Sequence, residues 1–224
     1  MSSTIAQNLQ KILSEIPENV VLVAVSKTKS EAEIMEAYQV GQRIFGENKI
    51  QEMTEKYGAL PKDIQWHMIG HVQTNKVKYM APYVSLIHGV DSFKLLKEID
   101  KQAAKNNRII DCLLQIHIAE EETKFGLSEN ELFEILNSED FSQLKNICVK
   151  GLMGMATFTD NTVQIKKEFS YLKSLFCKIK NTKTNNLNPE ILSMGMSGDY
   201  PIAIAEGSTM VRIGSSIFGE RNYL

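Results

Sequence analysis

The feature that most constrains the fold of this chain is a regular alternation of short apolar segments with segments of helical periodicity. The apolar segments are rich in β-branched residues, which is typical of strands buried on both faces of a parallel sheet. Because strands and helices alternate with short connections, we expect parallel strands joined by right-handed crossovers. The eight expected strands are residues 20–26, 43–46, 64–69, 84–90, 109–118, 146–155, 191–194 and 210–213.

Helical segments follow most of these strands, and one additional helix precedes the first strand. Ser2 or Ser3 is expected to cap this additional helix, and Ser92 and Ser128 are expected to cap two later ones. A polar, Asn-rich loop is expected over residues 181–189. The expected helices are residues 3–16, 30–38, 49–59, 73–80, 92–106, 129–136, 162–180 and 201–206.

This alternation predicts an α/β protein, a single (β/α)8 TIM barrel with an extra N-terminal helix, in which residues 1–224 form one domain. An open, doubly wound sheet is the alternative that the same alternation allows. The barrel is favoured because candidate polar residues follow nearly every strand, whereas an open sheet would gather them at one switch point.

The charge balance excludes several classes of partner. The 224 residues carry a formal net charge of -2, which indicates neither a nucleic-acid nor an anionic-membrane partner. No apolar run reaches the ~20 residues that span a bilayer, and the first residues lack the pattern of a secretory signal. The cysteines Cys112, Cys148 and Cys177 are too widely spaced for a zinc pattern, and their odd number does not fit a disulfide framework. We therefore expect a cytoplasmic protein.

Lys27 is the first candidate for chemistry. It follows the C-terminal end of the first apolar strand in the stretch VVLVAVSKTK, where an apolar environment would border its amine on one side and the mouth of a site on the other. Partial loss of hydration disfavours the charged form of an amine, which is the requirement for a lysine that forms Schiff bases. The alternative is that Lys27 is only the first solvated residue after a strand.

Two loops rich in glycine and serine follow the seventh and eighth expected strands. Their sequences are SMGMSGDYP and VRIGSSIFG. In barrels these two loops often bind phosphate through backbone N–H groups, and glycine lets the backbone approach an anion closely. The alternative is that they are turns and caps, with Ser197 or Asp199 capping the helix at Pro201. Together with Lys27, the loops favour a phosphorylated carbonyl ligand.

The remaining polar residues near strand ends are weaker candidates. His67 and His71 lie four positions apart, but they lack the glutamate of an HExxH zinc motif. His88 and His117 lie in apolar strands, where a hydrogen-bonded core histidine is the usual case. Asp91 precedes the helix start at Ser92. Met155 lies at the C-terminal end of the sixth expected strand.

Several motifs together resemble a known family. AVSKTK, FGEN, WHMIGHVQTNK, GLMGMA, LSMGMSGDY and STMVRIGSSIFGER occur in this order along the chain. The chain is similar over its whole length to the YggS/PROSC family of pyridoxal 5′-phosphate (PLP) homeostasis proteins, which resemble the N-terminal barrel of alanine racemase. The segment GLMGMATFTDN departs from the proline-containing stretch of many relatives.

The resemblance implies a barrel that carries PLP as a Schiff base. Lys27 of AVSK would be the lysine of this internal aldimine, and Asn48 of FGEN would lie close to the ring. Arg212 of VRIG would face the pyridine nitrogen. Lys124, in the KFG segment, would be a second lysine near the cofactor. The phosphate would be held by Ser197, Gly214 and Ser215.

An arginine beside the pyridine nitrogen points to a binding protein with little or no turnover. Arg212 is always charged and cannot accept the proton that a catalytic electron sink requires. The implied function is therefore PLP homeostasis, without enzyme activity. The expected partners are PLP and apo PLP-enzymes as acceptors, and the expected state is a monomer. A PLP-dependent amino-acid racemase is the first alternative, and a cofactor-free, aldolase-like barrel that uses Lys27 is the second.

Overall fold

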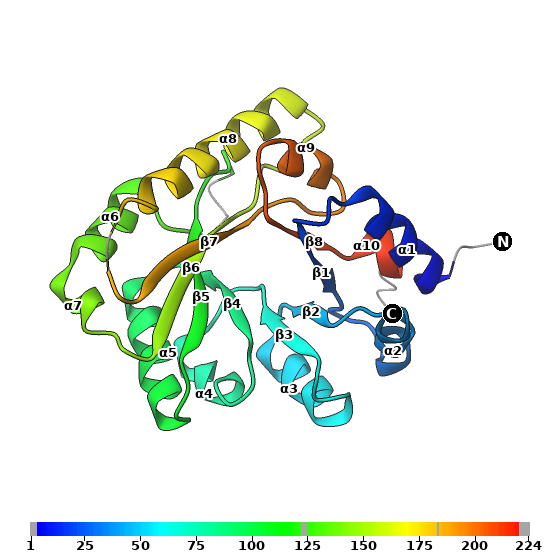
Figure 1. Ribbon diagram of the computed structural model, residues 1–224, viewed down its shortest axis with the longest axis horizontal. Helices are drawn as coiled ribbons and strands as arrows, with labels where there is room; N and C mark the ends of the chain where they lie inside the picture. Colours follow the sequence, from blue (N-terminus) through cyan, green and yellow to red (C-terminus); the bar gives the residue numbers. More distant parts are fainter. Residues whose placement is uncertain (1–3, 122–124, 183, 220–224) are drawn as a thin grey trace.

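The protein is a closed barrel of eight parallel strands with helices around its outside (Figure 1). The computed structural model describes residues 4–121, 125–182 and 184–219. The strands pair in chain order and β8 closes the barrel against β1, so the predicted TIM barrel is confirmed and the open sheet is wrong. The strands are β1 (Val21–Val25), β2 (Ile44–Glu47), β3 (Gln65–Met68), β4 (Leu86–Val90), β5 (Ile110–Ile116), β6 (Ile147–Gly154), β7 (Leu187–Ser193) and β8 (Met210–Ile213).

The helices connect successive strands, and α1 lies beside the last helix, α10 (Figure 1). The side chain of Asn8 in α1 donates to the Ile217 carbonyl of α10 at 3.0 Å, which joins the first and last helices of the chain. The helices are α1 (Ile5–Glu15), α2 (Glu31–Gln39), α3 (Ile50–Ala59), the 3-10 turn η1 (Thr74–Lys76), α4 (Val77–Met80), α5 (Phe93–Lys105), α6 (Glu129–Asn137), α7 (Glu139–Ser142), α8 (Thr162–Ile179), α9 (Tyr200–Ala205) and α10 (Ser215–Phe218).

Side-chain caps explain where several helices begin. Ser92 and Ser128 cap α5 and α6 as predicted, each accepting from a backbone N–H in the first turn. The predicted cap of α1 at Ser2 or Ser3 is wrong: those serines lie outside the described residues, and Thr4 occupies the cap. Thr4 accepts from the Gln7 N–H while the Gln7 side chain accepts from the Thr4 N–H, a reciprocal capping box that favours this start.

Strand β7 begins earlier than the sequence predicts, inside the expected loop 181–189. Asn188 and Pro189 lie within β7, where the pairing with β6 shifts register between Val149 and Gly151. Proline is tolerated at such irregularities because no regular ladder hydrogen bond is required of its nitrogen. The polar composition therefore indicated a loop where the barrel has a strand.

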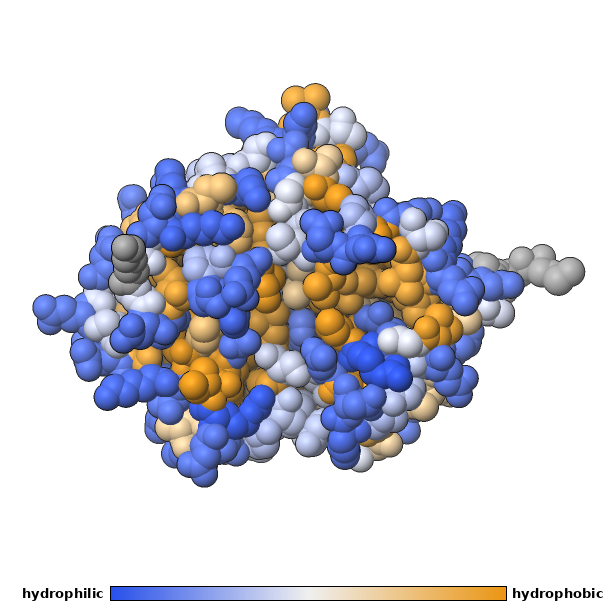
Figure 2. All heavy atoms as spheres, in the orientation of Figure 1, coloured by the Kyte–Doolittle hydropathy of each residue, from blue (hydrophilic) through white to orange (hydrophobic). Residues whose placement is uncertain are grey.

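Alternate residues of several strands face two separate apolar layers. Val23 lies in the barrel interior with Leu86, Leu113 and Met153, whereas its neighbours Leu22 and Ala24 pack in the layer beneath the helices. Polar side chains cover most of the face seen in Figure 2, with apolar atoms visible between them. Within the described ranges, no helix combines the length and apolarity that a membrane crossing requires.

Candidate functional site

The strand ends border a cavity of about 600 Å³, and it brings together all six residues singled out from the sequence. Parallel strands place their carboxyl ends at the same end of a barrel, so residues far apart in the chain meet there. The cavity is also bordered by Met155 and by the loop that follows β6. The six predicted residues in its wall are Lys27, Asn48, Ser197, Arg212, Gly214 and Ser215.

Lys27 lies in a tight turn directly after β1. The Lys29 N–H donates to the Ser26 carbonyl at 3.1 Å, and Thr28 has a φ of 65°. Because side chains alternate along an extended chain, Lys27 follows the inward series of Val23 and Val25. Its half-buried side chain borders the cavity, as expected of a lysine that ends a barrel strand.

The two glycine- and serine-rich loops lie side by side and are joined by a hydrogen bond. The Gly214 N–H donates to Ser197 Oγ at 3.3 Å, which connects the loop after β7 with the loop after β8. Gly195 has a φ of 97°, and a Cβ there would lie 2.6 Å from the Cβ of Ala203. A Cβ on Gly214 would lie 3.2 Å from both the Cβ and the carbonyl oxygen of Val25. Glycine is therefore required at Gly195, and at Gly214 it allows close packing against β1.

The alternative interpretation, in which the side chain of Ser197 or Asp199 caps α9, is wrong. Asp199 occupies the cap position, but its carboxylate makes no cap hydrogen bond and instead accepts from the Met196 N–H at 2.6 Å. Ser197 faces the neighbouring loop, where it accepts from Gly214. Both side chains thus organise the loop before α9, and the first turn of α9 contains a proline, which needs no partner for its nitrogen.

Arg212 brings a buried guanidinium group to the same cavity. Its Nη1 donates to Ser193 Oγ at 2.6 Å and its Nη2 donates to the Gly154 carbonyl at 3.1 Å. Burial lowers the pKa of Arg212 to about 10, while the nearby Asp199 carboxylate opposes that shift. The group therefore remains a cation at physiological pH, held by strands β6 and β7.

A chain of hydrogen bonds continues from Arg212 across the barrel interior. Ser193 Oγ lies 3.0 Å from His88 Nδ1, and His88 Nε2 lies 3.1 Å from His67 Nδ1. Burial lowers the pKa of His67 to about 3 and that of His88 well below its ordinary value. Both histidines are therefore neutral, which confirms the interpretation of His88 as a hydrogen-bonded core residue.

Because arginine can only donate, Ser193 accepts from Arg212 and its own hydroxyl hydrogen is free to be donated to His88 Nδ1. The proton of neutral His88 then lies on Nε2 and is donated to His67. Ser193 was not expected to take part in the site. Its signal in the sequence is its place as the first residue of SMGMSGDYP, at the end of β7.

Other candidates have separate partners. His71 Nδ1 lies 3.1 Å from Asp91 Oδ2, whereas His67 pairs with His88, so the two histidines have different partners. Asp91 thus pairs with His71 in addition to preceding α5. His117 lies beyond β5, half-buried, with Nε2 2.9 Å from the Glu121 carbonyl, so its placement in the strand core is wrong. Among the residues described, no three His, Cys, Asp or Glu side chains gather as a metal site. Lys124 lies outside the described residues.

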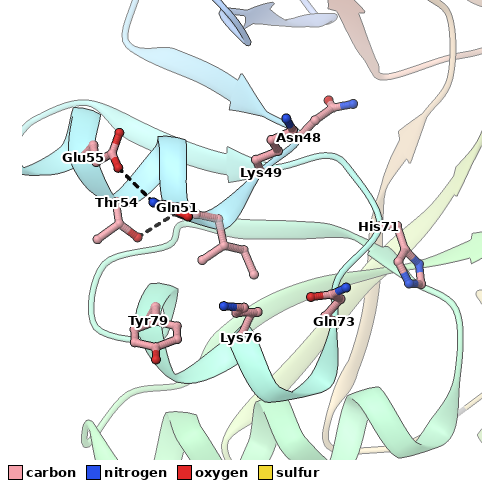
Figure 3. Close-up of a pocket in the computed structure, with 10 residues that line it drawn as sticks. Asn48, Lys49, Gln51, Thr54, Glu55, His71, Gln73, Lys76 and Tyr79 are labelled. Atoms are coloured by element: carbon pink, nitrogen blue, oxygen red, sulfur yellow. Dashed lines mark hydrogen bonds between the residues drawn. The ribbon is translucent and has the colours of Figure 1, made fainter.

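A second cavity, of about 680 Å³, lies between α3 and the η1–α4 segment (Figure 3). Gln51 and Thr54 border it from α3, Lys49 borders it from the position just before α3, and Lys76 and Tyr79 border it from the facing helices. Neither the strand-end lysine nor the buried guanidinium nor the glycine-rich loops line it. Only its junction with the first cavity, at Asn48, belongs to the predicted site.

The residues around the first cavity have the chemistry that PLP requires. An amine can hold an aldehyde, glycine- and serine-rich loops can hold a phosphate, and a buried cation can donate to a ring nitrogen. The two loops approach each other closely enough for Ser197 to accept from Gly214, and Gly214 leaves space where a Cβ would crowd Val25. The donor set therefore fits the cofactor that the resemblance implies.

Comparison with known proteins agrees with this chemistry. The family "Alanine racemase, N-terminal domain" matches residues 2–222. A pyridoxal phosphate homeostasis protein of Aquifex aeolicus is 41% identical over 90% of this chain and 87% of its own. One of Vibrio alginolyticus is 40% identical over 99% of both chains.

Solved structures show the same fold. PipY of Synechococcus elongatus, solved with PLP bound, is 34% identical, with a TM-score of 0.88 over 96% of this chain and 100% of its own. Alanine racemase of Bartonella henselae is 16% identical, with a TM-score of 0.73 over 97% of this chain and 60% of its own, a likeness of fold alone. The chain therefore belongs to the family of pyridoxal phosphate homeostasis proteins, which share the barrel of the alanine racemase N-terminal domain.

Proposed function

We propose that this protein binds pyridoxal 5′-phosphate in the cavity at the carboxyl ends of its strands and serves PLP homeostasis without enzymatic turnover. The observation that carries the proposal is the convergence of a strand-end lysine, a buried arginine and two glycine-rich loops on one cavity of about 600 Å³. The relatives named pyridoxal phosphate homeostasis proteins and the PLP-bound PipY structure support it.

Each wall of the cavity has a proposed task. Lys27 holds the cofactor covalently through its Nζ, and Asn48 lies beside the ring. Arg212 donates to the pyridine nitrogen. The phosphate is held by Ser197, Gly214 and Ser215.

The positive charge of Arg212 favours a PLP-binding protein and not a PLP-dependent enzyme. When bound, PLP supplies an aldehyde that condenses with amines and a ring that stabilises negative charge at a substrate carbon. The ring does the latter well only when its nitrogen is protonated, and a permanently charged donor at that nitrogen keeps the proton away. Ser193 and neutral His88 hold the guanidinium in place and cannot remove its charge.

The same proposal covers the domain organisation, location, oligomeric state and partners of the protein. We infer that residues 1–224 act as one domain, as a cytoplasmic monomer without nucleic-acid or membrane partners. Apo PLP-enzymes would be the acceptors of the cofactor. Reversible PLP loading followed by transfer to an apo-enzyme would test this part. A complex that never releases PLP would contradict it.

The first test is the visible absorbance of the protein mixed with PLP, measured in parallel for Lys27→Ala. We expect a yellow Schiff-base band in the wild-type protein and none in the variant, because Lys27 is the proposed site of attachment. Borohydride reduction followed by peptide mapping should place the label on Lys27. A colourless wild-type protein in the presence of PLP would refute the proposal and bring forward the aldolase-like alternative.

Enzymatic turnover has its own measurement. Chiral analysis of alanine or serine after long incubation with the PLP-loaded protein should show no racemisation. Turnover above ~1 s⁻¹, a low value for an enzyme, would establish the racemase alternative and overturn the non-enzymatic part of the proposal.

A further inference from the structure

A buried cluster of charged residues lies behind the turn that carries Lys27, on the outer side of the barrel wall. Lys56, on α3, is only 6% exposed. Its Nζ donates to the Ser26 carbonyl at 2.8 Å, to Glu47 Oε1 at 2.8 Å and to Glu52 Oε1 at 2.7 Å. An ammonium group has three donors, so every donor of Lys56 is used.

Ser26 forms hydrogen bonds to this cluster through two of its atoms. Its Oγ donates to Glu47 Oε1 at 2.6 Å, while its carbonyl accepts from Lys56. Ser26 and Glu47 are both fully buried. The outward side chain of the residue just before Lys27 is therefore fixed between β2 and α3, while Lys27 itself faces the cavity.

Burying charged groups costs free energy, so this cluster is an unfavourable way to attach α3 to the barrel. Burial raises the pKa of Glu47 although Lys56 and Ser26 both oppose that shift. Glu47 Oε2 is also buried without a hydrogen-bond partner in the part of the chain that the structure describes. Replacing a buried ion pair with apolar residues is often neutral or stabilising, so stability alone does not explain the cluster.

The turn itself is strained at Thr28. Thr28 has a φ of 65°, a strained conformation that is unusual for a β-branched residue. Its N–H donates to Glu52 Oε1 at 2.6 Å, and the same oxygen accepts from Lys56. Glu52 thus stabilises the strained residue on one side of Lys27, while Glu47 and Lys56 fix Ser26 on the other.

We propose that Lys56, Glu47 and Glu52 are positioning residues that hold the Ser26–Thr28 turn so that Lys27 Nζ meets the aldehyde carbon of PLP. The inference rests on the proposed function and adds to it the residues on which attachment depends. In the step concerned, unprotonated Lys27 Nζ adds to the aldehyde carbon, two protons pass from nitrogen to oxygen, and water leaves as the C=N bond forms. No oxidant or reductant is needed.

The decisive variant is Glu52→Ala, because Glu52 is the most exposed member of the cluster and its loss leaves the Lys56–Glu47 pair intact. The matched control is Glu55→Ala, a change to an exposed glutamate of the same helix that contacts Gln51. Attachment is followed by the rate of appearance of the Schiff-base band and by borohydride trapping of Lys27. Non-covalent binding is followed with pyridoxine 5′-phosphate, which carries an alcohol in place of the aldehyde.

We expect Glu52→Ala to slow attachment about 10- to 100-fold, because a misplacement of about 1 Å has effects of that size. Its affinity for pyridoxine 5′-phosphate should stay within about twofold of the wild type, since the phosphate loops and Arg212 are untouched. Glu55→Ala should match the wild type in both measurements. Wild-type attachment in Glu52→Ala would overturn the proposal, and so would parallel losses of attachment and of pyridoxine 5′-phosphate binding.

A second substitution tests whether turn geometry is the cause. Thr28 is exposed and glycine adopts positive φ without strain, so Thr28→Gly should restore most of the attachment rate in the Glu52→Ala background. An unrestored rate would overturn the positioning role. The proposed function fails differently: if wild-type protein forms no adduct at Lys27, both ideas are wrong. If wild type and Glu52→Ala form it equally fast, only the positioning role is wrong.

Discussion

Single residues in the barrel interior determine the charge state of the site. Arg212 is a buried cation whose hydrogen bond to Ser193 begins a chain through His88 to His67. Arg212 only donates, whereas Ser193 and His88 each accept on one side and donate on the other, so no protonated histidine is needed to satisfy the chain. The arrangement keeps the positive charge localised at Arg212, beside the cavity.

Removing the hydroxyl of Ser193 should interrupt this chain. Ser193→Ala leaves Arg212 Nη1 and His88 Nδ1 without the partner they share, and an unsatisfied buried polar group costs about 1–3 kcal/mol. We expect a loss of that size in the free energy of unfolding, measured by urea denaturation without PLP. Ser14→Ala, at an exposed position of α1, serves as the control and should change stability by less than about 0.5 kcal/mol. Equal stability of the two variants would contradict the role given to Ser193.

At the scale of elements, two glycines differ in whether their surroundings leave space for a Cβ atom. Gly151 lies in β6 with a φ of 145°, and a Cβ there would lie 1.9 Å from the Ile191 carbonyl oxygen of β7. The pairing of β6 shifts register here against both neighbouring strands. Gly58 lies in α3, and a Cβ there would meet no atom within 4 Å. The close approach of strands therefore requires glycine at only one of the two positions.

Alanine at these positions should change stability with opposite signs. Gly151→Ala should destabilise the protein by about 2–5 kcal/mol, because backbone strain and overpacking add. Gly58→Ala should stabilise it by about 0.5–1 kcal/mol, because the unfolded chain loses conformational freedom. Urea denaturation of both variants measures the difference. A destabilised Gly58→Ala or a neutral Gly151→Ala would show that the strand and helix environments are described incorrectly.

For the whole molecule, the neutral histidines inside the barrel couple stability to pH. In the unfolded chain a histidine has a pKa near 6.5, whereas burial lowers the pKa of His67 to about 3. Between these two pKa values, His67 therefore binds a proton in the unfolded state but not in the folded state. The stability is fully present above pH ~6.5 and is lost as the pH falls toward 3.

The expected loss is about 1.4 kcal/mol from each such histidine between pH 7.5 and pH 5.5. His88 contributes in the same direction, because burial lowers its pKa as well. Urea denaturation at the two pH values measures the total. His67→Gln should reduce this pH-dependent loss of unfolding free energy by the contribution of one histidine, whatever the substitution does to stability at pH 7.5. Parallel pH profiles for wild type and His67→Gln would contradict a neutral, buried His67.

Local pattern was sufficient for the architecture and for the residues around the cavity. Apolar strands that alternate with helices allow few topologies, and a barrel gathers all its strand ends at one rim. Lys27 and the two glycine-rich loops could therefore be assigned to one cavity from their places after β1, β7 and β8. The roles of these residues toward PLP remain predictions that the absorbance and trapping experiments test.

Tertiary contacts decided the rest, because they join residues that no local pattern relates. Ser193 and His88 are 105 positions apart and meet only because the barrel closes. Lys56 reads in the sequence as an ordinary helix lysine, and only the packing of α3 against β2 places it under Ser26. The early start of β7 likewise depends on its pairing with β6, not on its own polar residues. Hydrogen bonds and burial depend on which surfaces meet, and that is set only when the chain has closed into its barrel.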